Sequence, residues 1–351
     1  MKILVLNTFG RQRDTDTFYA EDVREALAKL GDVDYLKYER TPEGYEELKR
    51  RIVGVEVMFT GWAVPKLGDD FYEAAKDLKI IAHTGGTVAD MVDEAFLKRG
   101  DIRILSGNNY YAESVASATI CYILMALRKL YNTLKITERD GWHTIDFNRG
   151  LRKRTVGLVS FGMISKHVAR MLQPFDCKVK VWSSHAISEE EKAKYNIEQC
   201  SIEELFSTSD VVSVHSGLSE KTYHLVDARL LGMMKQDALL VNTARGAVID
   251  EAALEPVVQA GKISAILDVF EVEPLPMDSK LRGLENVIIV PHDGGPTIDV
   301  HHLVTLGLID DVRKFFNGET ELENEISVEY AKNMTSNTAV AKARQSRSQQ
   351  K

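Results

Sequence analysis

Polar groups suited to acid–base chemistry follow four consecutive strand-like runs in the second half of this 351-residue chain. They are His215 and Ser216, then Thr243 and Arg245, then Asp268 and Glu273, and finally His292 with Gly294 and Gly295. The carboxyl ends of parallel strands meet at one edge of a sheet, so we expect these groups to converge on a single crevice. Taken singly, each has a structural interpretation as an ion pair, a turn cap or a satisfied histidine. Four such strands in succession are not expected by chance.

The run VGLVSFGMIS, residues 156–165, is an apolar strand-like stretch that turns at Gly162. Dinucleotide-binding turns use the pattern G-x-G-x-x-G, in which the middle glycine lets the backbone approach the pyrophosphate. This chain keeps Gly162 and has Ser160 and Ser165 at the other two positions. The pattern alone is a weak signal, because an ordinary strand-to-helix turn also matches it. A strand before the turn and a helix from Met163 and Ile164 favour a nucleotide site.

The first third of the chain alternates short β-branched runs with amphipathic stretches, which predicts a parallel sheet with helices on both faces. The strand-like runs are residues 2–9, 32–38, 54–61, 78–84 and 101–107. Thr41 followed by Pro42 marks the start of a helix, since proline at the first helical position loses no needed hydrogen bond.

A second, larger doubly wound domain is predicted after an apolar helix over residues 112–134, which we expect to be buried against another domain or subunit. Six strand-like runs follow it, at residues 154–162, 177–184, 210–217, 237–246, 262–271 and 286–295. A closing helix is expected over residues 300–318. Residues 334–351 are polar and mildly basic, so we interpret them as a disordered tail.

Composition excludes several functional classes. The 44% hydrophobic and 27% charged residues are ordinary for a soluble globular protein. A formal net charge of −8, without a Lys/Arg block in the folded region, argues against a nucleic-acid partner. The N-terminus lacks signal-peptide features and no uncharged run reaches about 18 residues, so we expect no membrane association and a cytoplasmic location. The three cysteines form no C-x-x-C pair, and we expect neither disulfides nor a metal site.

Several segments resemble the signatures of the D-isomer-specific 2-hydroxyacid dehydrogenases, which depend on NAD(P). They are LLVNTARGAVIDEAAL, ILDVFEVEPLP with NVIIVPHDGG after it, and DVVSVHSGLSEKT, and the resemblance extends over about residues 1–325. It implies an α/β protein with two doubly wound parallel-sheet domains. Residues 1–108 and 298–333 would form a discontinuous, flavodoxin-like substrate domain, and residues 109–297 a Rossmann cofactor domain, with the active site in the cleft between them.

The resemblance also implies the catalytic residues. Arg245 matches the arginine that binds the substrate carboxylate and carbonyl oxygen, and Glu273 and His292 match the acid–base pair. A 2-oxo acid accepts hydride at carbon while its oxygen needs a proton, which an imidazolium gives near neutral pH. A carboxylate on the other ring nitrogen favours the charged imidazole and fixes its orientation. The arginine offers a permanently charged fork that matches a carboxylate.

The remaining site residues are carried over in the same way. Thr84, Gly85 and Gly86 match the loop that holds the substrate carboxylate, and Asp268 matches the residue that faces the nicotinamide carboxamide. The expected cofactor-binding residues are Ser160, Gly162, Met163, Ile164, Ser183, Ser184, His215, Ser216, Thr243, Ala244, Asp268 and Gly294.

The chain departs from the family pattern after the strand-like run that ends near Trp182. An acidic residue usually binds the adenosine ribose there, whereas this chain has Ser183, Ser184 and His185. Loss of the carboxylate removes the repulsion of a 2′-phosphate, which favours NADP(H) over NAD(H). Three glutamates at residues 189–191 and the absence of an arginine partner weigh against this preference.

A second departure is Asp293, which stands beside His292 where the family is apolar or small. Either this carboxylate raises the pKa of His292, or it points away and caps a helix that starts near Thr297.

The leading functional prediction is a homodimeric dehydrogenase that reduces a small 2-oxo acid, of the glyoxylate or hydroxypyruvate type, to a D-2-hydroxy acid. The dimer prediction rests on residues 112–134, which resemble the family's dimer-forming element. The alternative is a non-catalytic NAD(H)-binding sensor or corepressor-like protein, because the glycine loop is degenerate. Retention of Arg245, Glu273 and His292 favours the enzyme. Formate dehydrogenases share the fold but carry glutamine where this chain has Glu273.

Overall fold

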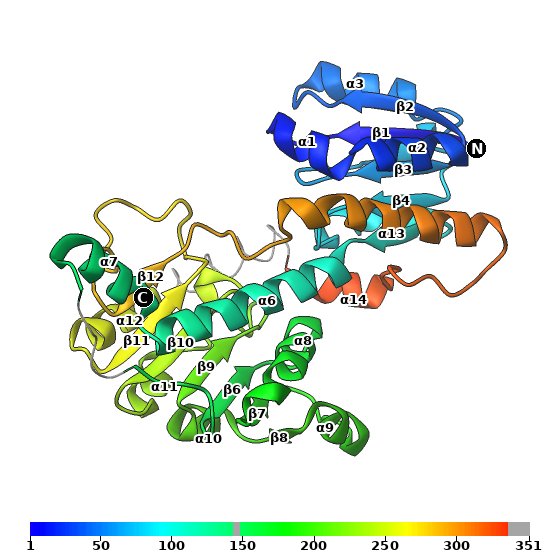
Figure 1. Cartoon of the computed structure of the whole chain (residues 1–351). Coiled ribbons are helices and arrows are strands. Elements are labelled where there is room, and N and C mark those ends of the chain that lie inside the picture. Colours follow the sequence, from blue (N-terminus) through cyan, green and yellow to red (C-terminus); the bar gives the residue numbers. More distant parts are fainter. Residues whose placement is uncertain (143–147, 336–351) are drawn as a thin grey trace. The chain divides into compact units, whose positions relative to one another are not determined.

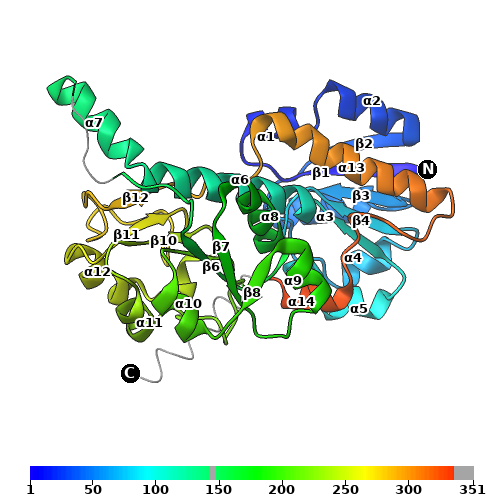
Figure 2. The same ribbon diagram turned by 60° about the horizontal axis from the view of Figure 1, so that its bottom comes forward.

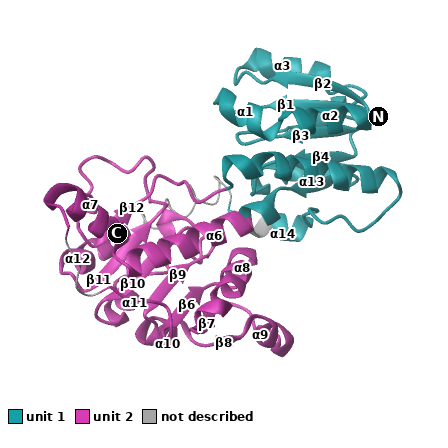
Figure 3. Cartoon of the chain, viewed as in Figure 1, with its two compact units in different colours: residues 1–111, 296–341 teal, residues 112–295, 342–351 magenta. Residues whose placement is uncertain are grey.

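The computed structural model describes residues 1–142 and 148–335 and divides the chain into two compact units. Unit 1 holds residues 1–111 and the described residues from 296 onward, and unit 2 holds the described residues of 112–295 (Figure 3). These boundaries fall a few residues from the predicted ones. Residues 336–351, most of the predicted tail, lie outside the described residues.

Unit 1 is built on a sheet of five parallel strands in the order β2-β1-β3-β4-β5 (Figure 1). This is the flavodoxin-like order, and the fold class predicted for the first domain is confirmed. The strands are β1 (Lys2–Asn7), β2 (Asp32–Lys37), β3 (Val57–Thr60), β4 (Ile80–His83) and β5 (Arg103–Ser106).

Both faces of this sheet are covered because successive strand residues point to opposite sides. Ile3 and Val5 of β1 pack in one apolar cluster with residues of α1, α2 and α13, whereas Leu4 and Leu6 pack with residues of α3, α4 and α5. The helices of unit 1 are α1 (Gln12–Phe18), α2 (Glu21–Leu30), α3 (Pro42–Arg51), α4 (Asp69–Ala74), α5 (Glu94–Arg99), α13 (Ile298–Phe316) and α14 (Val328–Asn333). The predicted start of α3 is confirmed, since the Thr41 side chain accepts the Gly44 N–H at 3.1 Å.

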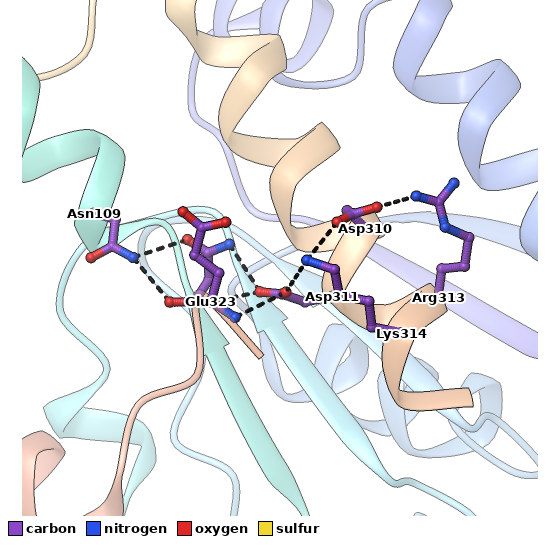
Figure 4. A network of polar contacts seen from close by, with 7 residues as sticks. Asn109, Asp310, Asp311, Arg313, Lys314 and Glu323 are labelled. Atoms are coloured by element: carbon purple, nitrogen blue, oxygen red, sulfur yellow. Dashed lines mark hydrogen bonds and ion pairs between the residues drawn. The ribbon is translucent and has the colours of Figure 1, made fainter. Parts of the chain in front are cut away.

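A buried carboxylate ties the segment after α13 to unit 1 (Figure 4). Asp311 is 1% exposed and accepts the backbone N–H groups of Glu323 and Asn324 at 3.1 and 2.7 Å. The side chain of Asn109 donates to the carbonyl oxygen of Glu323 at 3.0 Å. The two bonds to Asp311 satisfy the buried charge, and the Asn109 bond links the segment after α13 to the start of α6 (Asn108–Leu127).

Unit 2 contains seven parallel strands in the order β12-β11-β10-β9-β6-β7-β8. This is the Rossmann order, with its topological switch point between β6 and β9. Six strands correspond to the predicted runs, and the seventh, β8, was not predicted because it has only three residues. The strands are β6 (Thr155–Val159), β7 (Lys178–Trp182), β8 (Ile197–Gln199), β9 (Val211–Val214), β10 (Ala238–Asn242), β11 (Ile263–Leu267) and β12 (Val287–Ile289).

Unit 2 also contains α8 (Met163–Leu172), α9 (Glu189–Tyr195), α10 (Ile202–Thr208), α11 (Ala228–Met233) and α12 (Glu251–Gln259). The helix predicted over residues 112–134 is in fact two helices, α6 (Asn108–Leu127) and α7 (Leu130–Asp140). The break falls at Lys129, whose φ of 50° is left-handed and cannot continue a right-handed helix. Figure 2 shows α7 extending away from the sheet of unit 2.

Among the residues that the structure describes, α6 alone is long and apolar enough to cross a membrane by length and composition. Its buried residues are Ala112, Ala116, Thr119, Ile123 and Leu127. They recur every three or four positions and so form one stripe, of which three members belong to the apolar cluster of unit 2. A stripe of this kind is typical of a helix packed on a globular core.

Candidate active site

The predicted nucleotide turn lies between β6 and α8, at the switch point of unit 2. Ser160 follows β6 with a φ of 81°, and its hydroxyl lies 2.7 Å from that of Ser216, which follows β9. The Ser165 hydroxyl donates to the Ser160 carbonyl oxygen at 2.7 Å. The two serines that replace glycine are therefore bonded within the turn itself, and the structure accommodates both.

Gly162 is the N-cap of α8, and a Cβ on it would meet no atom of the described part of the chain within 4 Å. The space beside its Cα is therefore open, as a turn that cradles a phosphate requires. Met163 and Ile164 form the first turn of α8, and the positive end of a helix dipole at its N-terminus favours an anion. These residues fit the pyrophosphate of a dinucleotide.

Predicted cofactor residues at the ends of β9 and β10 are buried. His215 is 8% exposed, and neither ring nitrogen has a hydrogen-bond partner among the described residues. Burial lowers the pKa of His215 to about 3, so this imidazole is neutral. The Thr243 hydroxyl lies 3.1 Å from that of Thr119 on α6, and the Ala244 N–H donates to the Asn242 side chain at 3.1 Å.

The loop after β7 presents hydroxyl groups rather than a carboxylate. The Ser184 hydroxyl lies 3.0 Å from Nδ1 of His185, and the His185 N–H donates to the Ser183 hydroxyl at 3.2 Å. Ser184 and His185 are exposed. Of the three nearby glutamates, Glu191 is neutralised by Lys166, whose Nζ lies 2.5 Å from its carboxylate.

The predicted acid–base pair is brought together across 19 residues of sequence. Nδ1 of His292 lies 2.7 Å from Oε2 of Glu273, and the Phe270 N–H donates to Oε1 of the same carboxylate at 3.0 Å. The hydrogen bond to Glu273 raises the pKa of His292, although burial and the Arg245 charge oppose the change. Burial alone would raise the pKa of Glu273, but the bonds from His292 and Phe270 lower it. The pair therefore favours a charged imidazole beside an ionised carboxylate.

Asp268 holds the loop that carries His292. Its two oxygens accept the backbone N–H groups of Asp293 and Gly294 at 2.8 and 3.1 Å. His292 itself has a φ of 54°, which is a left-handed backbone conformation. Any residue other than glycine loses free energy in this conformation, and the two bonds to Asp268 stabilise the loop that holds it. Besides Glu273, the carboxylate that raises the pKa of His292 is Asp268. The predicted effect of Asp293 on that pKa finds no support here.

Arg245 follows β10 and lies on the same edge of the sheet. Burial lowers its pKa, and the charge of Glu273 opposes this change. Its Nη1 donates to the carbonyl oxygen of Ala244 at 2.6 Å, and no other acceptor among the described residues occupies its fork, whose remaining donors suit an anion.

The predicted substrate loop belongs to unit 1. The Thr84 hydroxyl is buried and donates to the carbonyl oxygen of Thr60 at 3.0 Å. The carbonyl oxygens of Gly85 and Gly86 accept the Ser106 hydroxyl at 3.1 and 2.6 Å. A Cβ on Gly85 would lie 2.3 Å from Nε2 of His83, so any larger residue there would displace the His83 side chain.

Sequence reasoning missed a cluster of His224, Asp250 and Glu271 in unit 2, whose potential ligand atoms lie within 4.8 Å of one another. Nδ1 of His224 lies 3.6 Å from Asp250, and Nε2 lies 2.9 Å from Glu271, outside hydrogen-bond angles. A metal ion binds one ring nitrogen, so carboxylates beside opposite nitrogens of His224 do not have the arrangement of a metal tripod. The carboxylates come from segments about 20 residues apart, and no spacing motif signals them.

A Glu273→Gln variant tests the electrostatics of the pair. If His292 donates the proton in the reduction of an oxo group, as the sequence predicts, activity should fall as pH rises through the pKa of His292. Removing the Glu273 charge removes the main cause of the raised pKa, and the descending limb of the pH–kcat profile should shift down by about one pH unit. An unshifted limb in the variant would contradict this assignment.

The strand order, the open turn at Gly162 and the polar carboxyl edge define unit 2 as a dinucleotide-binding domain of the Rossmann type. Residues 120–294 match the model of the D-isomer specific 2-hydroxyacid dehydrogenase NAD binding domain. A hydroxypyruvate reductase of Thermotoga maritima is 33% identical over 274 residues, which cover 77% of this chain and 87% of that protein. A glyoxylate reductase of Thermofilum pendens is 33% identical over 264 residues, 74% of this chain and 77% of that protein.

The fold is also that of apo D-mandelate dehydrogenase from Rhodotorula graminis, with a TM-score of 0.78 and 22% identity over 93% of this chain and 97% of that one. The chain therefore belongs to the D-isomer-specific 2-hydroxyacid dehydrogenase family, and it is an NAD(P)-dependent oxidoreductase. The family and the two-domain α/β fold predicted from the sequence are confirmed.

Proposed function

We propose that this chain reduces a small 2-oxo acid, of the glyoxylate or hydroxypyruvate type, to the D-2-hydroxy acid. The observation that carries the proposal is the 2.7 Å contact between His292 and Glu273, on the sheet edge that also bears Arg245. Relatives named hydroxypyruvate reductase and glyoxylate reductase, each 33% identical, support the substrate class.

The proposed mechanism assigns one task to each residue. Bound NAD(P)H supplies the hydride. Arg245 binds the substrate carboxylate and carbonyl oxygen through its fork and draws electron density toward that oxygen. His292 donates a proton from Nε2 to the same oxygen, while Glu273 holds Nδ1 and stabilises the charged ring. In the reverse direction the neutral His292 removes the hydroxyl proton.

Turnover with a panel of 2-oxo acids tests the proposal. Purified protein with NADPH or NADH should oxidise the cofactor when glyoxylate, hydroxypyruvate, pyruvate or a bulkier 2-oxo acid is added. Binding of the cofactor without turnover of any panel member would contradict the enzyme and favour the sensor alternative.

We also propose a preference for NADP(H), supported by the hydroxyl groups of Ser183 and Ser184 after β7 and by the pairing of Glu191 with Lys166. Ser183→Asp should weaken NADPH binding by about tenfold, because the carboxylate repels the 2′-phosphate, and should leave NADH binding equal or tighter. Dissociation constants from nicotinamide fluorescence measure both. A matched change outside this loop, Ser207→Asp on α10, should alter neither. Equal loss of both cofactors in Ser183→Asp would contradict the preference.

The homodimer is a further part of the proposal. The segment from α7 to Trp142 exposes apolar side chains, with Leu130 47%, Leu134 60% and Trp142 94% exposed. Burial of this apolar patch against a second copy of the chain would stabilise a homodimer. Sedimentation at micromolar concentration should show twice the mass of the chain, and a monomer alone would contradict the dimer.

A further inference from the structure

Two carboxylates without a role in the proposed mechanism tie the segment that carries Glu273 to α12. The Glu271 N–H donates to Oε1 of Glu251 at 2.5 Å, and the Glu251 N–H donates to Oε1 of Glu271 at 3.0 Å. The carboxylate of each residue thus accepts the backbone N–H of the other. These two hydrogen bonds join the first turn of α12 to the turn after β11.

The turn after β11 also packs against Gly246, the residue that follows Arg245. A Cβ on Gly246 would lie 1.8 Å from the carbonyl carbon of Phe270 and 2.4 Å from the nitrogen of Glu271, so the absence of a side chain lets the two backbones touch. The peptide group between Phe270 and Glu271 is therefore packed against Gly246 and bonded to Glu251. The preceding amide, that of Phe270, donates to the Glu273 carboxylate.

We propose that Glu251 is a positioning residue for the acid–base pair. Its carboxylate fixes the Phe270–Glu271 peptide, and the orientation of that peptide sets the Phe270 N–H that holds Glu273 against Nδ1 of His292. Glu251 acts through Glu273 and does not touch the reacting atoms. This inference rests on the proposed function where the measured quantity is kcat, and it does not where the measured quantity is the pKa of His292.

Capping of α12 does not account for the carboxylate of Glu251. Asp250 is the N-cap of this helix, and its side chain accepts the Ala253 N–H at 3.2 Å. Burial, together with the charges of Glu271 and Glu255, raises the pKa of Glu251 to about 7. An uncharged glutamine is therefore a close replacement near neutral pH, and it keeps an oxygen for the Glu271 N–H.

The test compares Glu251→Ala with Glu251→Gln. Glu255→Ala is the matched control, because Glu255 lies one turn further along α12 and pairs with Lys280 at 3.6 Å. Glu251→Ala should lower kcat by about tenfold, with KM for the 2-oxo acid and the Kd of NADPH nearly unchanged. An NMR pH titration of labelled histidine should show the pKa of His292 falling toward its ordinary value. Glu251→Gln should restore most of kcat and of the raised pKa.

Three outcomes would overturn the proposal: an unchanged kcat and His292 titration in Glu251→Ala, equal damage from Glu251→Gln, or the same damage from Glu255→Ala. If the wild-type protein reduces no 2-oxo acid, the proposed function fails. The NMR titration still tests the positioning role in that case, because it needs no turnover.

Discussion

His292→Ala is expected to lower kcat for 2-oxo acid reduction by about a thousandfold, which is the scale of a lost general acid. The imidazole is the proton donor in the proposed mechanism. Among the described residues, no other titratable side chain forms a hydrogen bond with Glu273 and could replace His292. The side chain is 51% exposed, so its removal costs little packing. Cofactor binding and thermal unfolding should therefore stay close to those of the wild type, as measured by nicotinamide fluorescence and circular dichroism.

His302→Ala is the matched control. His302 lies on α13 and is also paired with a carboxylate, Asp22, at 2.8 Å, but it has no role in the proposed chemistry. This variant should keep kcat. If His292→Ala kept near-native turnover, or if both variants lost it equally, the assignment of His292 would be wrong.

Gly162→Val should lower the affinity for NADPH and NADH by about a hundredfold, equivalent to roughly 2.8 kcal/mol of binding free energy. A Cβ at this position would meet no atom of the described residues within 4 Å, so the valine side chain should enter the open space that the pyrophosphate needs. The φ of Gly162, −91°, suits valine as well as glycine. The unfolding temperature should change little, which separates lost binding from lost folding.

Gly232→Val controls for the addition of a branched side chain. Gly232 lies on α11, and a Cβ there would also meet no described atom outside the backbone of its own helix within 4 Å. This variant should bind both cofactors normally. Unchanged affinity in Gly162→Val would show that the turn after β6 is not the pyrophosphate site.

Hydrophobic patterning predicted the fold because buried parallel strands are nearly continuous β-branched runs, and all but one of the strands stand out in this way. The exception is β8, with the sequence IEQ, which is too short and too polar to give a signal. The break between α6 and α7 was missed because apolar periodicity continues through Lys129, and the left-handed backbone there has no glycine to mark it.

The ends of the strands predicted which side chains lie on one edge of the sheet, and His292 and Glu273 do meet there. Contacts that depend on backbone amides were not predictable in the same way. Asp268 accepts hydrogen bonds from two backbone N–H groups of the loop that carries His292. Glu251 and Glu271, 20 residues apart, each accept the backbone N–H of the other. Such pairs depend on the order of strands in the sheet and on turn geometry, which side-chain types do not encode. In the sequence, Asp250 and Glu251 stand before an apolar run and indicate only that a helix, α12, starts there.

The handedness of the product is the decisive test of 2-oxo acid reduction through His292. Any 2-oxo acid that the protein reduces to a chiral product, such as hydroxypyruvate, can be turned over with NADPH and the product resolved by chiral chromatography. We expect the D-isomer alone from the wild type and almost no product from His292→Ala. An L-isomer, a mixture of isomers, or equal product from His292→Ala would contradict it.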